Sequence, residues 1–111
     1  SVGEPTENTD AGKKFLADYA AAKFAEPSAA YGGYSYDAAK AIIEGLKVAL
    51  KDAKDVKSAR QAIVDAVGKV SFDGVTGKVG FDEFGDTKVK VISAYKVEGG
   101  KWVFEKSENL G

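Results

Sequence analysis

The fold of this chain is decided within residues 72–86, which read FDGVTGKVGFDEFGD. Over residues 75–81, apolar residues alternate with polar residues or glycine, the period-two pattern of a half-buried β-strand. Residues 82–86 supply turn chemistry, because Gly85 tolerates a positive φ and aspartates bond to nearby backbone N–H groups. The stretch therefore predicts a β-hairpin arm.

The alternation continues toward the C-terminus. Residues 88–97 alternate again, residues 98–101 (EGGK) form a second tight turn, and residues 102–105 are predicted to fold back as a last strand. Together these segments predict an antiparallel β-meander. Three lysines on one strand are interpreted as protection of a sheet edge against aggregation: Lys88, Lys90 and Lys96.

Helical periodicity occupies the part of the chain before the hairpin. The predicted helices run from the N-cap Asp10 to residue 24, from Ser35 or Tyr36 to Leu50, and from Val56 to Gly68. Gly45 lies inside the second helix, where glycine is about 1 kcal/mol less favourable than alanine, and we expect another backbone to approach closely there. The predicted fold class is α+β, with three helices packed on an antiparallel β-meander.

Size and composition limit what the chain does. With 111 residues it forms at most one domain or subdomain, residues 1–111, and its polar start predicts a flexible linker over residues 1–9. Its net charge of −1 provides no attraction for nucleic acid, and no apolar run is long enough for direct membrane insertion. The chain has no cysteine and no histidine, so the commonest metal ligands and the commonest general base are missing. We predict no enzyme activity, no metal and no cofactor.

The acidic residues of the hairpin do not form a convincing reactive site. Asp82, Glu83 and Asp86 lack the ligand spacing of a calcium loop and are interpreted as a solvated turn. Nothing in the sequence fixes the separation of Asp73 and Asp82, so they are not read as a catalytic carboxylate pair.

Five loose motifs occur in a fixed order: Tyr36-Asp-Ala38 at the start of a helix, a helix centred on Arg60, Phe72-Asp-Gly-Val-Thr-Gly77, Val79-Gly-Phe-Asp82 with Gly85-Asp86, and Gly99-Gly-Lys-Trp-Val103. In this order and spacing the chain resembles the C-terminal portion of the type I periplasmic solute-binding proteins of ABC transporters, the branched-chain amino acid (Leu/Ile/Val) type. The resemblance runs from about Ala11 to Phe104.

The resemblance implies a fold and a biological setting. Members of that family have two α/β lobes that close on a ligand, and this chain corresponds to a fragment of one lobe whose last strands cross back toward the other. The implied partners are a small-molecule ligand (an amino acid) in the intact parent and an ABC permease. The implied location is periplasmic or extracytoplasmic, and the chain alone is expected to bind ligand weakly or not at all.

The family comparison also implies a ligand-binding stretch, formed by Tyr31, Gly32, Gly33 and Tyr34. Glycines allow close approach of a ligand to the backbone, and tyrosines offer a flat apolar face with a polar tip. In the alternative reading, Tyr31, Tyr34 and Tyr36 only cap a small core beside a loop.

Two other functions remain open from the sequence. Both faces of residues 88–97 carry apolar side chains, so the chain is alternatively a free-standing module that self-associates as a homodimer. It is also compatible with a ligand-sensing domain of a regulator, because one fold serves several functions.

Overall fold

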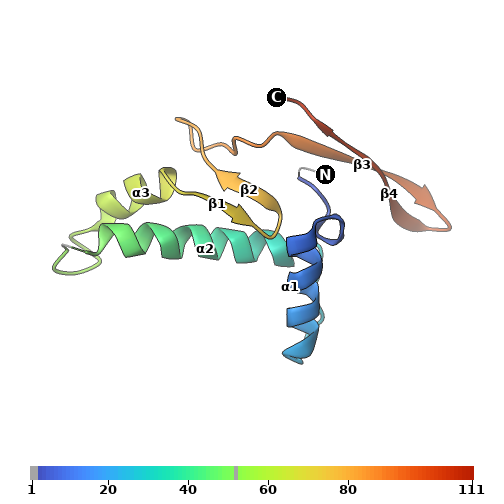
Figure 1. The fold of residues 1–111 in the computed structure, drawn as a ribbon, viewed down its shortest axis with the longest axis horizontal. Coiled ribbons are helices and arrows are strands. Elements are labelled where there is room, and N and C mark those ends of the chain that lie inside the picture. Colours follow the sequence, from blue (N-terminus) through green and yellow to red (C-terminus); the bar gives the residue numbers. More distant parts are fainter. Residues whose placement is uncertain (1–2, 52) are drawn as a thin grey trace.

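The structure is a computed structural model that describes residues 3–51 and 53–111. In chain order the elements are η1 (Thr6–Asn8, a 3₁₀ helix), α1 (Asp10–Ala21), α2 (Gly32–Ala49), α3 (Arg60–Gly68), β1 (Ser71–Gly74), β2 (Gly77–Gly80), β3 (Val91–Glu98) and β4 (Lys101–Asn109). Figure 1 shows β1 and β2 lying along α2, with α3 near one end of α2 and α1 crossing the other end. The predicted α+β class is confirmed.

The strands form two sheets where the sequence predicted one meander. β1 pairs with β2 and β3 pairs with β4, both antiparallel, as separate two-stranded sheets. The hairpin arm begins earlier than predicted, because the chain already turns between Gly74 and Gly77, inside the predicted strand over residues 75–81. The β3–β4 hairpin extends away from the helices (Figure 1).

Both predicted turns are confirmed. An Asp82 carboxylate oxygen accepts hydrogen bonds from the backbone N–H groups of Phe84 and Asp86, each at 2.9 Å, and Gly85 has a φ of +87°. At the second turn Gly99 and Gly100 have φ values of +56° and +76°, the left-handed pair that two-residue hairpin turns require. β4 runs to Asn109, four residues beyond the predicted end at residue 105.

The helices start at different residues from those predicted. Thr9, not Asp10, is the N-cap of α1, since its hydroxyl accepts the backbone N–H of Gly12 at 2.9 Å. α2 starts at Gly32, one turn before Ser35, because the N–H of Ser35 already bonds to the carbonyl of Tyr31 at 2.9 Å. α3 starts at Arg60 rather than Val56, since the preceding residues form a turn.

The predicted close approach at Gly45 is confirmed. A Cβ added at Gly45 would lie 2.4 Å from Cγ2 of Val67 and 3.0 Å from its backbone nitrogen, so α2 and α3 are in near backbone contact there. Gly45 thus fixes the distance between the two helices.

We expect Gly45→Ala to lower the free energy of unfolding by about 1 kcal/mol or more, because overpacking outweighs the better helix propensity of alanine. Val67→Ala removes the nearest clashing atom. The double variant should therefore lose less stability than the sum of the two single losses, as measured by urea unfolding. Additive losses would show that the two positions do not contact each other.

Residues 3–9 have more structure than the predicted linker, while residues 1 and 2 lie outside the described residues. The N–H of Gly3 donates to the carbonyl of Val91 at 2.7 Å, and the Ser93 hydroxyl donates to the Gly3 carbonyl at 2.6 Å. The Tyr34 hydroxyl donates to the carbonyl of Glu4 at 3.0 Å. This segment therefore links the β3–β4 hairpin to the start of α2.

The chain exposes more surface than a compact domain of its size. Its accessible surface is 8137 Å², whereas about 5900 Å² is expected for a compact monomer of this mass. Its radius of gyration is 16.5 Å against an expected value of about 13 Å. Apolar side chains of α2 are among the exposed ones, for example those of Ile42, Ile43 and Val48. The fold therefore exposes an unusually large surface for 111 residues, and apolar side chains of α2 form part of it.

Candidate functional site

A buried carboxylate joins α2 to the β1–β2 turn. Asp37, from the Tyr-Asp-Ala motif, is only 4% exposed, and one of its oxygens accepts the N–H of Val75 at 2.8 Å. The other oxygen accepts the N–H of Thr76 at 2.8 Å and its hydroxyl at 2.7 Å. Because all three donors belong to the turn, Asp37 holds the hairpin against the helix, which is a positioning role.

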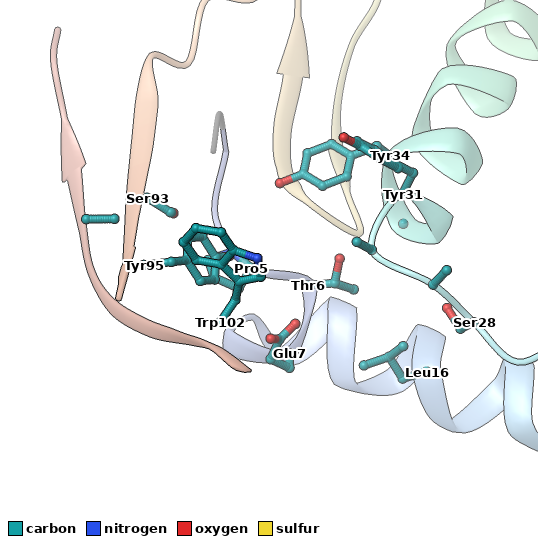
Figure 2. A pocket seen from close by; sticks show the side chains of 14 residues that line it. Pro5, Thr6, Glu7, Leu16, Ser28, Tyr31, Tyr34, Ser93, Tyr95 and Trp102 are labelled. Atoms are coloured by element: carbon teal, nitrogen blue, oxygen red, sulfur yellow. The ribbon is translucent and has the colours of Figure 1, made fainter. Parts of the chain in front are cut away.

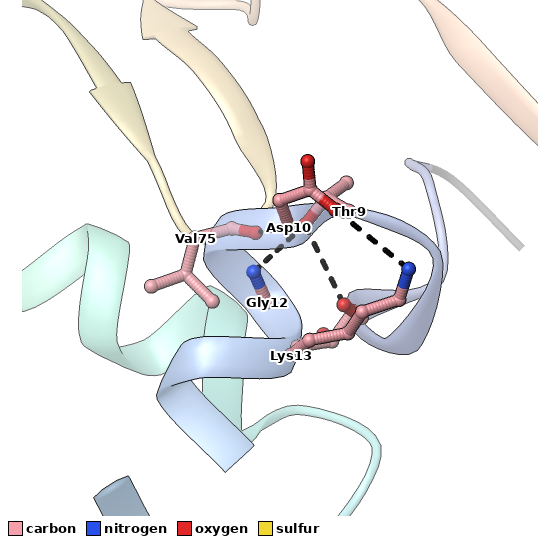
Figure 3. A network of polar contacts seen from close by, with 6 residues as sticks. Thr9, Asp10, Gly12, Lys13 and Val75 are labelled. Atoms are coloured by element: carbon pink, nitrogen blue, oxygen red, sulfur yellow. Dashed lines mark hydrogen bonds and ion pairs between the residues drawn. The ribbon is translucent and has the colours of Figure 1, made fainter. Parts of the chain in front are cut away.

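Thr9 connects the same turn to α1. Its hydroxyl donates to the carbonyl of Val75 at 2.9 Å while accepting the N–H of Gly12 (Figure 3). Gly12 is required here, because a Cβ would lie 1.7 Å from the carbonyl oxygen of Thr6. Gly33 packs against the same cluster, its would-be Cβ 2.8 Å from the Thr6 hydroxyl. The starts of α1 and α2 are thereby held together.

A cavity of about 1310 Å³ opens beside this junction. Its wall is formed by η1, by Leu16 of α1, by the loop before α2 and the first turn of α2, and by the β3–β4 hairpin. Its aromatic members are Tyr31, Tyr34, Tyr95 and Trp102. Figure 2 shows Tyr95 and Trp102 on the hairpin side with Glu7 near them, and Tyr31 and Tyr34 on the α2 side. Its volume and its aromatic lining make this cavity the candidate ligand site.

The structure brings three of the four predicted site residues to this cavity. Tyr31, Gly33 and Tyr34 line it, and Gly32 does not. The stretch was expected to be a loop before the helix, whereas Gly32 and Gly33 form the first turn of α2. Both glycines have close neighbours within the fold, so their small size already has a packing reason. A role of the four residues in binding a ligand stays a prediction.

Tyr31 and Tyr36, for which the sequence left ligand binding and core capping open, lie in different surroundings. Tyr31 is 80% exposed beside the cavity, so it does not cap a core. Tyr36 instead packs against Phe15, with ring centroids 5.4 Å apart, and does not line the cavity. The core-capping interpretation therefore suits Tyr36 better than Tyr31.

The cavity has an acidic electrostatic character. Burial raises the pKa of Tyr34, and the neighbouring Tyr95, Glu4 and Glu7 raise it further. Burial also raises the pKa of Tyr95, with Glu7 and Glu4 as additional causes. Glu7 is the one charged residue among the described residues that line the cavity. The Glu7 carboxylate therefore has no lysine or arginine to balance it among the described residues that line the cavity.

Sequence reasoning missed the hairpin side of the cavity. Glu7 fell within the predicted linker, and Tyr95 and Trp102 were assigned only to strands. The signal in the sequence was Trp102, the one tryptophan of the chain, directly after the EGGK turn. The structure leaves its side chain 76% exposed, and large exposed aromatic residues often mark recognition surfaces.

Other kinds of site find little support. Among residues 3–51 and 53–111, no three Asp, Glu, His or Cys side chains are grouped to hold a metal ion. Within the same residues, no helix combines the length and apolar character needed to cross a bilayer.

The comparisons with known proteins agree with this architecture. Two solved structures share the fold. A leucine-binding protein from Thermotoga maritima has a TM-score of 0.68 and 27% sequence identity, and the match covers 92% of this chain. An ABC-transporter solute-binding protein from R. palustris, in complex with benzoate, has a TM-score of 0.65 and 21% identity over 97% of this chain. No curated protein matches the chain in sequence.

The chain spans only 27% of the length of each of these two structures. The resemblance to type I periplasmic solute-binding proteins is confirmed at the level of fold. The model of the family described as receptor family ligand binding region matches residues 9–95, most of the chain. The chain therefore belongs to this family, whose description is "receptor family ligand binding region".

Proposed function

We propose that this chain is part of an extracytoplasmic solute-binding protein that captures a branched-chain or related amino acid for uptake by an ABC transporter. The observation that carries the proposal is the aromatic cavity between the start of α2 and the β3–β4 hairpin. The 27% identity to a leucine-binding protein supports an amino acid as the ligand.

The large accessible surface supports the proposal that the chain is part of a longer protein. The accessible surface exceeds that of a compact monomer by roughly 2200 Å². Further elements of a two-lobed parent would cover this surface and close the open side of the cavity, as in a clamp that shuts on its ligand. The implied partner in transport is an ABC permease, and the implied location is the periplasm or its equivalent.

Isothermal titration calorimetry of the longer protein against a panel of amino acids tests the proposal. We expect an aliphatic amino acid to bind with a Kd in the micromolar range or below, about −8 kcal/mol or more favourable. Tyr31→Ala should weaken that binding, whereas Tyr36→Ala, outside the cavity, should leave it unchanged. Failure of every aliphatic amino acid to bind would contradict the transport function.

Self-association is the second candidate, and the exposed hairpin favours it. Val97 and Trp102, paired across β3 and β4, are 60% and 76% exposed. Light scattering of the 111-residue chain tests for the homodimer, because a stable dimer would have twice the mass of the monomer. A monomer would remove the homodimer from consideration and leave the solute-binding proposal intact.

A further inference from the structure

The β3–β4 hairpin has little direct packing against the helices. Within residues 3–51 and 53–111, the elements that pack extensively on each other are β3 with β4, α2 with α3, β1 with β2, and η1 with α1. No helix in these residues packs extensively against the hairpin. The hairpin nevertheless carries Tyr95 and Trp102 of the cavity wall, so its position relative to α2 needs another cause.

The strap, residues 3–5, lies between α2 and β3. The Gly3 N–H donates to a β3 carbonyl at 2.7 Å, and the Gly3 carbonyl accepts the Ser93 hydroxyl at 2.6 Å. On the other side, the Tyr34 hydroxyl donates to the Glu4 carbonyl at 3.0 Å. Figure 2 shows Tyr34 and Ser93 on opposite sides of this segment. The strap is therefore hydrogen-bonded to the helix and to the hairpin at the same time.

The strap also lies directly against the ring of Tyr34. A Cβ added at Gly3 would lie 2.5 Å from the Tyr34 hydroxyl oxygen and 2.9 Å from Cε1 of its ring. Gly3 has a φ of +90°, a conformation that glycine adopts at no steric cost. Glycine at this position thus allows the main chain to reach both partners.

Ser93 is held in the orientation that this connection needs. It is 2% exposed, and its hydroxyl oxygen lies 2.8 Å from that of Ser107 on β4. A hydroxyl has one hydrogen, and the Ser93 hydrogen goes to the Gly3 carbonyl, so the Ser107 hydroxyl donates to Ser93. A buried hydroxyl without its acceptor is unfavourable, so the serine pair favours the bound position of the strap.

A β-bulge separates this connection from the cavity wall. The pairing of β3 with β4 shifts between Ala94 and Tyr95. A bulge bends the strand and increases its twist. Ser93 lies on one side of the bend, and the cavity residues Tyr95 and Trp102 lie beyond it. A rotation of the hairpin at the strap therefore moves both aromatic residues relative to α2.

We propose that the hydroxyls of Tyr34 and Ser93 form a latch that holds the β3–β4 hairpin in one orientation relative to α2. While both bonds are made, Tyr95 and Trp102 stay at the cavity. When either bond breaks, the hairpin swings about the strap and the width of the cavity changes. Tyr34 is then a positioning residue. The latch concerns the conformation of the chain itself and does not depend on the ligand of the proposed function.

Distance measurement between two spin labels on the 111-residue chain tests the latch. The chain contains no cysteine, so Lys47→Cys and Lys101→Cys place one label on the exposed side of α2 and one beside the hairpin turn. We expect one narrow distance distribution from double electron–electron resonance. Adding Tyr34→Phe or Ser93→Ala should broaden it, because the hairpin then samples further orientations.

Amide hydrogen exchange gives a second readout on the chain without labels. Tyr34→Phe and Ser93→Ala should each raise the exchange rate of the Gly3 amide by about fivefold or more, because the strap opens more often. The amides of Val75 and Thr76, which are bonded to Asp37 away from the strap, should keep their rates. A purely structural loss would raise all three rates together.

Tyr36→Phe is the matched control, because Tyr36 lies on the same helix and packs against Phe15 instead of the strap. It should change neither the distance distribution nor the Gly3 exchange rate. Unchanged distances in Tyr34→Phe would overturn the latch, as would equal broadening in Tyr36→Phe. Circular dichroism checks that each variant folds, and Tyr34→Phe alone decides if the buried Ser93→Ala variant does not.

Discussion

Asp37→Ala is expected to lower the free energy of unfolding by about 3 kcal/mol or more, since hydrogen bonds to charged groups are worth about 1.5–3 kcal/mol each. The carboxylate is buried and accepts all three of its hydrogen bonds from Val75 and Thr76. Its removal leaves two backbone N–H groups without their acceptor, the one of Val75 in a buried position. Urea unfolding followed by circular dichroism measures the loss.

Asp73→Ala is the matched control for this experiment. Asp73 lies on the same hairpin, but its side chain is 87% exposed and forms an ion pair with Lys78 at 3.2 Å. An exposed pair of this kind contributes about 0–1 kcal/mol, so the control should unfold almost as the unmodified chain does. Equal losses for Asp37→Ala and Asp73→Ala would contradict the role assigned to Asp37.

Gly12→Ala is expected to destabilise the chain by about 2 kcal/mol or more, because the added methyl group meets backbone atoms that have no free space to move into. The new Cβ would lie 1.7 Å from the Thr6 carbonyl oxygen and 2.7 Å from the Thr9 hydroxyl. Relief requires η1 to shift away from α1. We therefore also expect loss of the Thr9 hydrogen bond to Val75, detectable as faster amide hydrogen exchange in the β1–β2 turn.

Gly68→Ala is the control variant for Gly12→Ala. Gly68 is the last residue of α3, and a Cβ there would meet no atom within 4 Å. Alanine is a better helix former than glycine, so this variant should gain up to about 1 kcal/mol in unfolding free energy. If Gly12→Ala were as well tolerated as Gly68→Ala, the tight junction of η1 and α1 would not exist in solution.

Much of the local structure follows from residue type alone. The two turns were predictable because Gly85, Gly99 and Gly100 tolerate positive φ at low cost and Asp82 bonds to its own backbone neighbours. The close packing at Gly45 was predictable because glycine within a helix has a cost that packing offsets. These features depend on one residue and its immediate neighbours.

The tertiary features were less accessible to prediction. The three bonds of Asp37 join residues 38 or 39 positions apart, a partnership that no local pattern encodes. Thr9 and Asp10 are both good N-caps, and only the additional bond from Thr9 to Val75 favours Thr9. The separation of the strands into two sheets likewise depends on the route of residues 81–90.

The candidate site was half predicted. Tyr31 and Tyr34, at the start of α2, line the cavity, and the cluster of glycines and aromatic residues around them was a visible local signal in the sequence. The other half comes from Glu7 and Trp102, which are nearly a hundred residues apart in the sequence. Their proximity arises because Gly3, four residues before Glu7, is hydrogen-bonded to β3, a pairing that periodicity does not reveal.

The central claim is that this chain contributes one wall of an amino-acid site that the longer, two-lobed protein completes. A side-by-side calorimetric titration of the 111-residue chain and the longer protein with leucine tests it most directly. We predict that the longer protein binds leucine and that the chain alone binds at least about a hundredfold more weakly, a difference of about 2.7 kcal/mol. Equal affinity of the two, or no binding by the longer protein, would contradict the claim.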